Sequence, residues 1–181
     1  MKTLYKWSIE DYHRLIETGI LAHKQVELLE GEIVQMSPEG PLHASVNYSV
    51  VEYLRSLFGQ RAVVREAHPI TLPNSEPEPD LAIVKPPYSN YIRTHPQPED
   101  IYWLIEIAKT TLADDLGRKK TIYAKAKIPE YWVMDLQDKQ LWIFRQPEGE
   151  DYLQTQQLTT GIVNSRVFPE VKVEVSKLLF F

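Results

Sequence analysis

Residues 101–135 constrain the fold more than any other part of the chain. Residues 101–108 form an apolar run of strand length, and a second run at 130–134 follows directly after Pro129. Between them, residues 111–114 have the spacing of a capping box that opens a helix, and proline disfavours helical geometry in the residue ahead of it. The order strand, helix, strand predicts that the two strands pair in parallel.

The rest of the chain predicts antiparallel pairs and two more helices. Ser8 and Asp11 form a capping box for a helix that ends near Gly19, and residues 26–36 predict a hairpin that turns at Glu30 and Gly31. Apolar patterning predicts a helix over 42–58 and strands over 62–72, 81–84, 140–145, 152–158 and 171–175. Residues 85–100 hold four prolines and few periodic apolar residues, which predicts a surface loop. We therefore expect an α/β (α+β) fold in which helices flank a mixed β-sheet.

Composition narrows the class of protein. The chain has 181 residues, of which 43% are apolar and 25% charged, and this suits a single domain over residues 1–181. Residues 1–20 are interrupted by charges and no apolar run has membrane length, so we expect a cytoplasmic protein without a membrane partner. The absence of cysteine excludes thiolate sites and favours metals that take oxygen ligands, such as Mg²⁺ or Mn²⁺.

Charge gives a mixed indication about nucleic acid. A formal net charge of −5 argues against a protein that coats nucleic acid through its overall field. Residues 116–127 nevertheless hold five basic residues and no acidic ones. Two interpretations stay open: Lys119, Lys120 and Lys127 contact nucleic acid, or the strip is an ordinary solvated helix face.

Two carboxylates interrupt apolar strands. Asp80 follows Pro79 at the start of one strand, and Glu106 lies inside the apolar run of another. A carboxylate at a buried strand position is costly unless it is paired or bound to a cation. Two of them on neighbouring strands would make an oxygen site for Mg²⁺, and such an ion suits phosphodiester hydrolysis because it polarises the phosphate and acidifies a water. The alternative for Asp80 is a strand-entry cap in a proline-rich turn.

Six motifs in chain order carry a family resemblance. They are ELLEGEIV (27–34), PLH (41–43), PD (79–80), IEI (105–107), DLGRK (115–119) with IYA (122–124), and IPEYW (128–132) through Asp135. Together they resemble the Uma-type family of "putative restriction endonucleases", which is common in cyanobacteria and belongs to the PD-(D/E)XK nuclease superfamily. The resemblance implies a restriction-endonuclease-like core and a metal-dependent nuclease site that acts on DNA.

The chain departs from the superfamily pattern at the lysine. That pattern places a lysine two residues after the second carboxylate, and here the position is Ala108. Lys109 does not replace it, because successive strand side chains point to opposite faces and Glu106 shares its face with residue 108. The resembling family supplies its lysine from the following helix, and its pattern falls on Lys119.

The resemblance therefore implies roles for particular residues. Asp80 and Glu106 would hold Mg²⁺ or Mn²⁺ together with the backbone carbonyl of Ile107. Lys119 would orient or help to deprotonate the attacking water and offset charge on the phosphate. Alternatively, Lys119 forms an ordinary helical ion pair with Asp115, four residues earlier, and that pair could itself position a catalytic lysine.

Accessory roles are expected for three further residues. His43, at the start of the long helix, could contact a water on the metal or a phosphate, or it could hydrogen-bond locally. Glu27 could add a third carboxylate or be an exposed strand residue. Asp115 is the third, through its spacing from Lys119.

We thus expect a Mg²⁺-dependent endonuclease with DNA as substrate. The alternatives are a catalytically inactive module of the same fold that binds or regulates, and a hydrolase of another phosphate ester. A basic groove beside the carboxylates would favour the nuclease, and carboxylates that point apart would favour the binding module. A homodimer is compatible with double-strand cleavage, which needs two sites, although the sequence gives no direct evidence for one.

Overall fold

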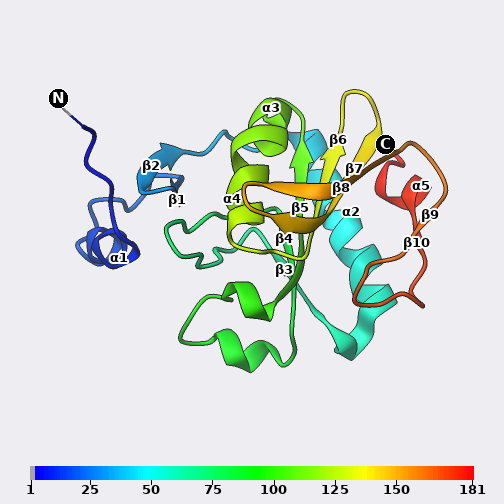
Figure 1. Cartoon of the computed structure of the whole chain (residues 1–181), viewed down its shortest axis with the longest axis horizontal. Helices are drawn as coiled ribbons and strands as arrows, with labels where there is room; N and C mark the ends of the chain where they lie inside the picture. Colours follow the sequence, from blue (N-terminus) through cyan, green and yellow to red (C-terminus); the bar gives the residue numbers. More distant parts are fainter. Residues whose placement is uncertain (1–2) are drawn as a thin grey trace.

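A six-stranded mixed β-sheet forms the centre of the computed structural model, which describes residues 3–181 (Figure 1). In spatial order the strands are β3 (Val63–Glu66), β4 (Leu81–Val84), β5 (Ile101–Ala108), β6 (Glu130–Asp135), β7 (Gln140–Glu148) and β8 (Asp151–Leu158). β5 and β6 pair in parallel, and the other neighbours are antiparallel. The predicted mixed sheet is therefore confirmed. Met1 and Lys2, which the predicted domain includes, lie outside the described residues.

Helices cover both faces of this sheet. The long helix α2 (Pro41–Phe58) lies on one face and α4 (Lys120–Lys125) on the other (Figure 1). Alternate residues of β5 go to opposite layers: Trp103, Ile105 and Ile107 pack in the core with α2, whereas Leu104 and Ala108 pack in the core with α4. Because side chains alternate along a strand, Glu106 belongs to the α4 side.

The chain begins with a helix and a hairpin at one end of the molecule (Figure 1). These elements are α1 (Ile9–Glu17), β1 (Val26–Leu29) and β2 (Glu32–Gln35). The Ser8 hydroxyl accepts a hydrogen bond from the Asp11 backbone N–H at 3.0 Å and donates one to the Asp11 carboxylate at 2.8 Å, so Ser8 caps this helix as predicted. Glu30 and Gly31 make the turn with φ of 49° and 76°. A Cβ on Gly31 would lie 2.9 Å from the Lys6 Cβ, so this turn requires glycine.

Several predicted elements are shorter than expected. The strand predicted over 62–72 is limited to β3, because Ala67 turns the chain with a φ of 44°. The strand predicted over 171–175 is only β10 (Val173–Glu174), which pairs with β9 (Ile162–Val163) and leads into α5 (Val175–Leu178). Short 3-10 turns occur at Gly59–Arg61, Tyr88–Tyr91 and Pro98–Asp100. Among residues 3–181, no helix combines the length and hydropathy needed to cross a membrane.

The helix after β5 is irregular. It begins at Leu112 with Thr111 as its N-cap, where the sequence predicted it, but the predicted capping box is not formed. Thr111 makes no capping bond to the backbone; its hydroxyl instead donates to the Asp115 carboxylate at 2.7 Å. The chain passes through α3 (Leu112–Asp114) and a π-helical turn η4 (Asp115–Lys119) before α4 begins. Such turns are rare in proteins, and those that occur often lie at functional sites. A Cβ on Gly117 would meet no heavy atom within 4 Å, so close packing does not explain this glycine.

Candidate active site

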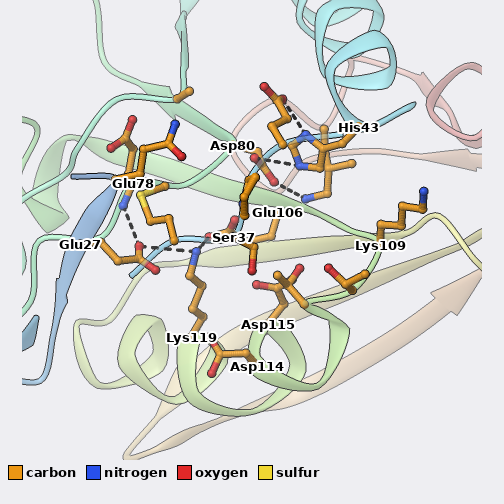
Figure 2. A pocket seen from close by; sticks show the side chains of 18 of the residues that line it. Glu27, Ser37, His43, Glu78, Asp80, Glu106, Lys109, Asp114, Asp115 and Lys119 are labelled. Carbon is orange, nitrogen blue, oxygen red and sulfur yellow. Dashed lines mark hydrogen bonds and ion pairs between the residues drawn. The ribbon is translucent and has the colours of Figure 1, made fainter. Parts of the chain in front are cut away.

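A pocket of about 650 Å³ opens beside the first residues of β4, the end of β5 and the start of α2 (Figure 2). Seven carboxylates and two lysines line it. The carboxylates are Glu27, Glu39, Glu78, Asp80, Glu106, Asp114 and Asp115, and the lysines are Lys109 and Lys119. Since like charges gathered in a partly buried space repel one another, a bound cation would stabilise this arrangement.

The strand register sets the relation between Asp80 and Glu106. In the β4–β5 ladder Leu81 faces Ile105, so Asp80, one residue earlier, falls opposite Glu106 and on the same face. The Asp80 Oδ2 atom accepts a hydrogen bond from the Ile107 backbone N–H at 2.6 Å. Both carboxylates line the same pocket, so they do not point apart.

Glu106 is held from one side only. Its Oε1 atom accepts hydrogen bonds from the Lys119 ammonium at 3.1 Å and from the Tyr123 hydroxyl at 2.7 Å. In the described part of the chain, no hydrogen bond to Oε2 is present. Burial raises the pKa of Glu106, whose residue is only 3% exposed, and the Lys119 charge opposes this rise. The protein thus fixes one oxygen of Glu106, and the other has no hydrogen bond from the described residues.

Lys119 lies between two carboxylates. Its ammonium is 3.1 Å from the Glu106 Oε1 atom and 3.6 Å from the Glu27 Oε2 atom (Figure 2). Burial disfavours the ammonium form, but Glu106 and Glu27 outweigh burial and raise the pKa of Lys119. Asp115 is not among the ion-pair partners of Lys119 within residues 3–181. The direct helical ion pair considered from the sequence is therefore not formed.

Asp115 and Glu27 are both buried in the site. Burial raises the pKa of Asp115 to about 6, although Lys119 and the Thr111 hydroxyl favour its charged form. Glu27 is 6% exposed, which excludes an exposed strand position, and its Oε2 atom accepts from the Glu78 backbone N–H at 3.1 Å. Burial and the nearby Glu27 carboxylate raise the pKa of Glu78.

His43 joins the start of α2 to Asp80. Its Nε2 atom is 3.1 Å from the Asp80 Oδ1 atom, and its Nδ1 atom is 2.7 Å from the Glu39 Oε1 atom. Burial alone would lower the pKa of His43, but the hydrogen bonds to Asp80 and Glu39 outweigh burial and raise it to about 9. The imidazolium therefore bonds locally to Glu39 and also fixes the carboxylate of Asp80.

The other basic residues of this region lie elsewhere. Lys120 forms an ion pair with Asp151 at 2.8 Å, and Lys127 is exposed. Of the three lysines predicted to contact nucleic acid, only Lys119 lines the pocket. Lys109 reaches the rim, but its side chain is directed away from Glu106 (Figure 2).

Two residues of the site were not assigned from the sequence. Tyr123 follows Lys119 by four residues, the spacing that places both side chains on one helix face against Glu106. Its helical spacing from Lys119 was a usable signal. Glu78 enters the pocket through its backbone bond to Glu27, a contact between distant segments that left no signal in the sequence.

Asp80 and Glu106 offer oxygen atoms, the donors that a hard divalent cation takes. No three His, Asp or Glu side chains among residues 3–181 form a complete metal-ligand cluster. Mg²⁺ commonly takes only one or two protein carboxylates and completes its shell with water and phosphate oxygens. Asp80 and Glu106 meet this requirement. The Ile107 carbonyl lies on the same edge of β5 as its N–H, which faces Asp80.

Comparison with known proteins agrees with this architecture. The crystal structure of "a putative nuclease belonging to DUF820" from Anabaena variabilis ATCC 29413 has a TM-score of 0.71 against this chain at 17% sequence identity. The match covers 86% of this chain and 89% of the other, and at this identity it shows a shared fold. No curated protein matches the chain. The model of the Uma2 family, described as "Putative restriction endonuclease", matches residues 9–176, and the chain therefore belongs to that family.

Proposed function

We propose that this protein is a metal-dependent endonuclease that hydrolyses DNA phosphodiester bonds. The observation that carries the proposal is the placement of Asp80 and Glu106 on neighbouring strands in one pocket, with the Lys119 ammonium 3.1 Å from Glu106. Asp80, Glu106 and the Ile107 carbonyl would hold Mg²⁺ or Mn²⁺. Such an ion, when bound, polarises the phosphate and lowers the pKa of a water.

Lys119 would act as a cation in this reaction. Its raised pKa keeps the ammonium charged at neutral pH, so the side chain is suited to orient the attacking water and to offset charge on the phosphate. Tyr123 and Glu27 would position Lys119. Tyr123 fixes the Glu106 oxygen that Lys119 contacts, and Glu27 contacts the ammonium from the other side.

The charge of the pocket makes a cation necessary for binding DNA. Seven carboxylates against two lysines and the His43 imidazolium would repel a phosphodiester at close range, in a chain whose net charge is already −5. We therefore expect DNA to bind at this pocket only when a divalent cation is present. Chelation should abolish binding at the pocket as well as cleavage.

Cleavage assays test the proposal directly. Purified protein would be incubated with supercoiled plasmid and with single-stranded DNA in Mg²⁺, Mn²⁺ or EDTA, beside Asp80→Asn, Glu106→Gln and Lys119→Met. Loss of one such group should slow cleavage by about 100-fold or more, while Lys127→Met, an exposed lysine outside the pocket, should cleave like the wild type. Circular dichroism confirms that each variant is folded. Cleavage that persists in EDTA or in Asp80→Asn would refute the assignment.

A catalytically inactive module is the second candidate, and one observation favours it. The strand position of the usual lysine is Ala108, and Lys119 is engaged by Glu106 and Glu27. A wild-type protein that binds Mn²⁺ and DNA but never cleaves would support this candidate. Light scattering in the same experiments would report whether the protein is a homodimer, as paired cleavage of two strands requires.

A further inference from the structure

A second cavity, of about 490 Å³, lies between α1 and the loop that precedes β5. Three side chains of basic residues, two hydroxyls and an amide line it, namely those of His13, Arg93, His95, Thr71, Thr94 and Gln97. No carboxylate is among the described residues that line this cavity. In a chain with a net charge of −5, a cavity with only basic and neutral donors contrasts with the acidic pocket described above.

A buried arginine adds positive charge next to this cavity. Arg65, on β3, is 5% exposed, and its guanidinium carbon lies 5.5 Å from the centre of the Tyr91 ring, which lines the cavity. Its Nε and Nη1 atoms have no hydrogen-bond partner in residues 3–181, and its Nη2 atom donates only to the Pro69 carbonyl at 3.5 Å. A buried cation without a counter-charge is costly, and an anion bound nearby would reduce that cost.

Glu76 holds two side chains that line the cavity. Its buried carboxylate bonds to the His13 Nε2 atom at 2.8 Å and accepts from the Thr71 hydroxyl at 2.7 Å, so it fixes two of the lining side chains. Burial lowers the pKa of His95; Glu76 opposes this, and Arg65, His13 and His68 lower it further. Three positively charged or basic groups, Arg65, His13 and His68, therefore lie close enough to His95 to act on it, together with the Glu76 carboxylate.

We infer that this second cavity binds a phosphate group. The His13 Nε2 atom and the Thr71 hydroxyl are already bonded to Glu76. The donors that remain for phosphate oxygens are the Arg93 guanidinium, the His95 ring and the Thr94 hydroxyl, and a guanidinium can bind phosphate through two parallel bonds. The phosphate would belong either to a nucleic-acid strand or to a free phosphate compound. The inference does not depend on the nuclease assignment, because it uses none of the residues of the carboxylate pocket.

Binding of inorganic phosphate to the metal-free full chain tests this inference. The five histidine ring signals would be followed by NMR during the titration, for the wild type, Arg93→Ala and the matched control Arg166→Ala, an exposed arginine outside the cavity. Phosphate should raise the pKa of His95. Loss of a charge-assisted bond from Arg93 should weaken binding about tenfold or more, and Arg166→Ala should bind like the wild type.

A second probe identifies the source of the phosphate. A short thymidine oligonucleotide would be titrated against the same variants in the Glu106→Gln background, which removes cleavage without touching this cavity. If Arg93→Ala weakens the oligonucleotide as well, the cavity holds a strand phosphate; if it weakens inorganic phosphate alone, the cavity holds a free phosphate compound. The inference is overturned if phosphate leaves His95 unchanged, or if Arg93→Ala and Arg166→Ala bind both probes equally.

Discussion

Replacing Lys119 with methionine should destabilise the metal-free protein in a way that depends on pH. The substitution keeps most of the side-chain volume but removes the ammonium from between Glu106 and Glu27. Removing one partner of a buried ion pair costs about 3–5 kcal/mol. Because the pocket admits water, we expect the lower end, about 3 kcal/mol of the free energy of unfolding at pH 9.

The pH dependence follows from Glu106. Burial already raises the pKa of Glu106 above its ordinary value of 4.5, and the pKa rises further once Lys119 is gone. When the pKa of a carboxyl group is higher in the folded than in the unfolded protein, the folded protein loses stability as pH rises above the unfolded-state pKa. The loss is complete once the pH exceeds the folded-state pKa. In the wild type the pKa of Lys119 is raised above its ordinary value of 10.5, so this ammonium stays charged at both pH 5 and pH 9. The deficit of the variant should therefore be small near pH 5 and largest near pH 9.

Urea unfolding in EDTA, followed by tryptophan fluorescence at pH 5 and pH 9, measures this deficit. Adding Glu106→Gln to Lys119→Met removes the stranded charge and should restore most of the loss at pH 9. Lys127→Met, which changes an exposed lysine, should stay within about 0.5 kcal/mol of the wild type at both values. A deficit that does not change with pH, or that the second substitution fails to relieve, would show that the charge of Glu106 is not its cause.

Three further predictions concern other parts of the molecule. The imidazole of His43 should titrate with a pKa of about 9 by NMR, and the stability it contributes through Asp80 should be present below pH 6.5 and be lost as pH rises through 9. Gly31→Ala should lower the free energy of unfolding more than Gly19→Ala, because both have positive φ but only Gly31 has backbone and side-chain atoms in the way; equal losses would contradict this. Trp103→Ala, which opens a cavity in the core under α2, should cost about 3–5 kcal/mol in urea unfolding, and a loss below 1 kcal/mol would be inconsistent with its burial.

The strands could be predicted where the sequence pattern and the physical cause coincide. Apolar runs bounded by proline identified β5 and β6, and a helical stretch between them required parallel pairing. The same patterns identified Glu106 as a candidate, because a charged residue is unusual in an apolar run. The structure places Glu106 opposite Asp80 in the pocket. Sequence-local rules sufficed for these strands because the burial of each strand is already visible in the pattern of its own side chains.

Contacts between distant segments could not be predicted in this way. Residues 111–114 have the spacing of a capping box, but the Thr111 hydroxyl donates its hydrogen bond to the Asp115 carboxylate instead of capping the helix. Burial of Glu27 depends on the 76–78 segment, which pairs with β1 across about fifty residues of sequence. The second cavity likewise combines α1 with the loop before β5, and no spacing relates His13 to Arg93.

The π-helical turn η4 places Lys119 on a different element from the strands that set the positions of Asp80 and Glu106. A π turn contains one residue more than an α-helical turn, and each residue of an α-helix advances the side chain by about 100° around the axis. Shortening η4 by one residue would therefore swing Lys119 away from Glu106 while β4 and β5 kept their carboxylates in register. The lysine is thus adjustable independently of the carboxylates, so changes in helix length can retune one without disturbing the other.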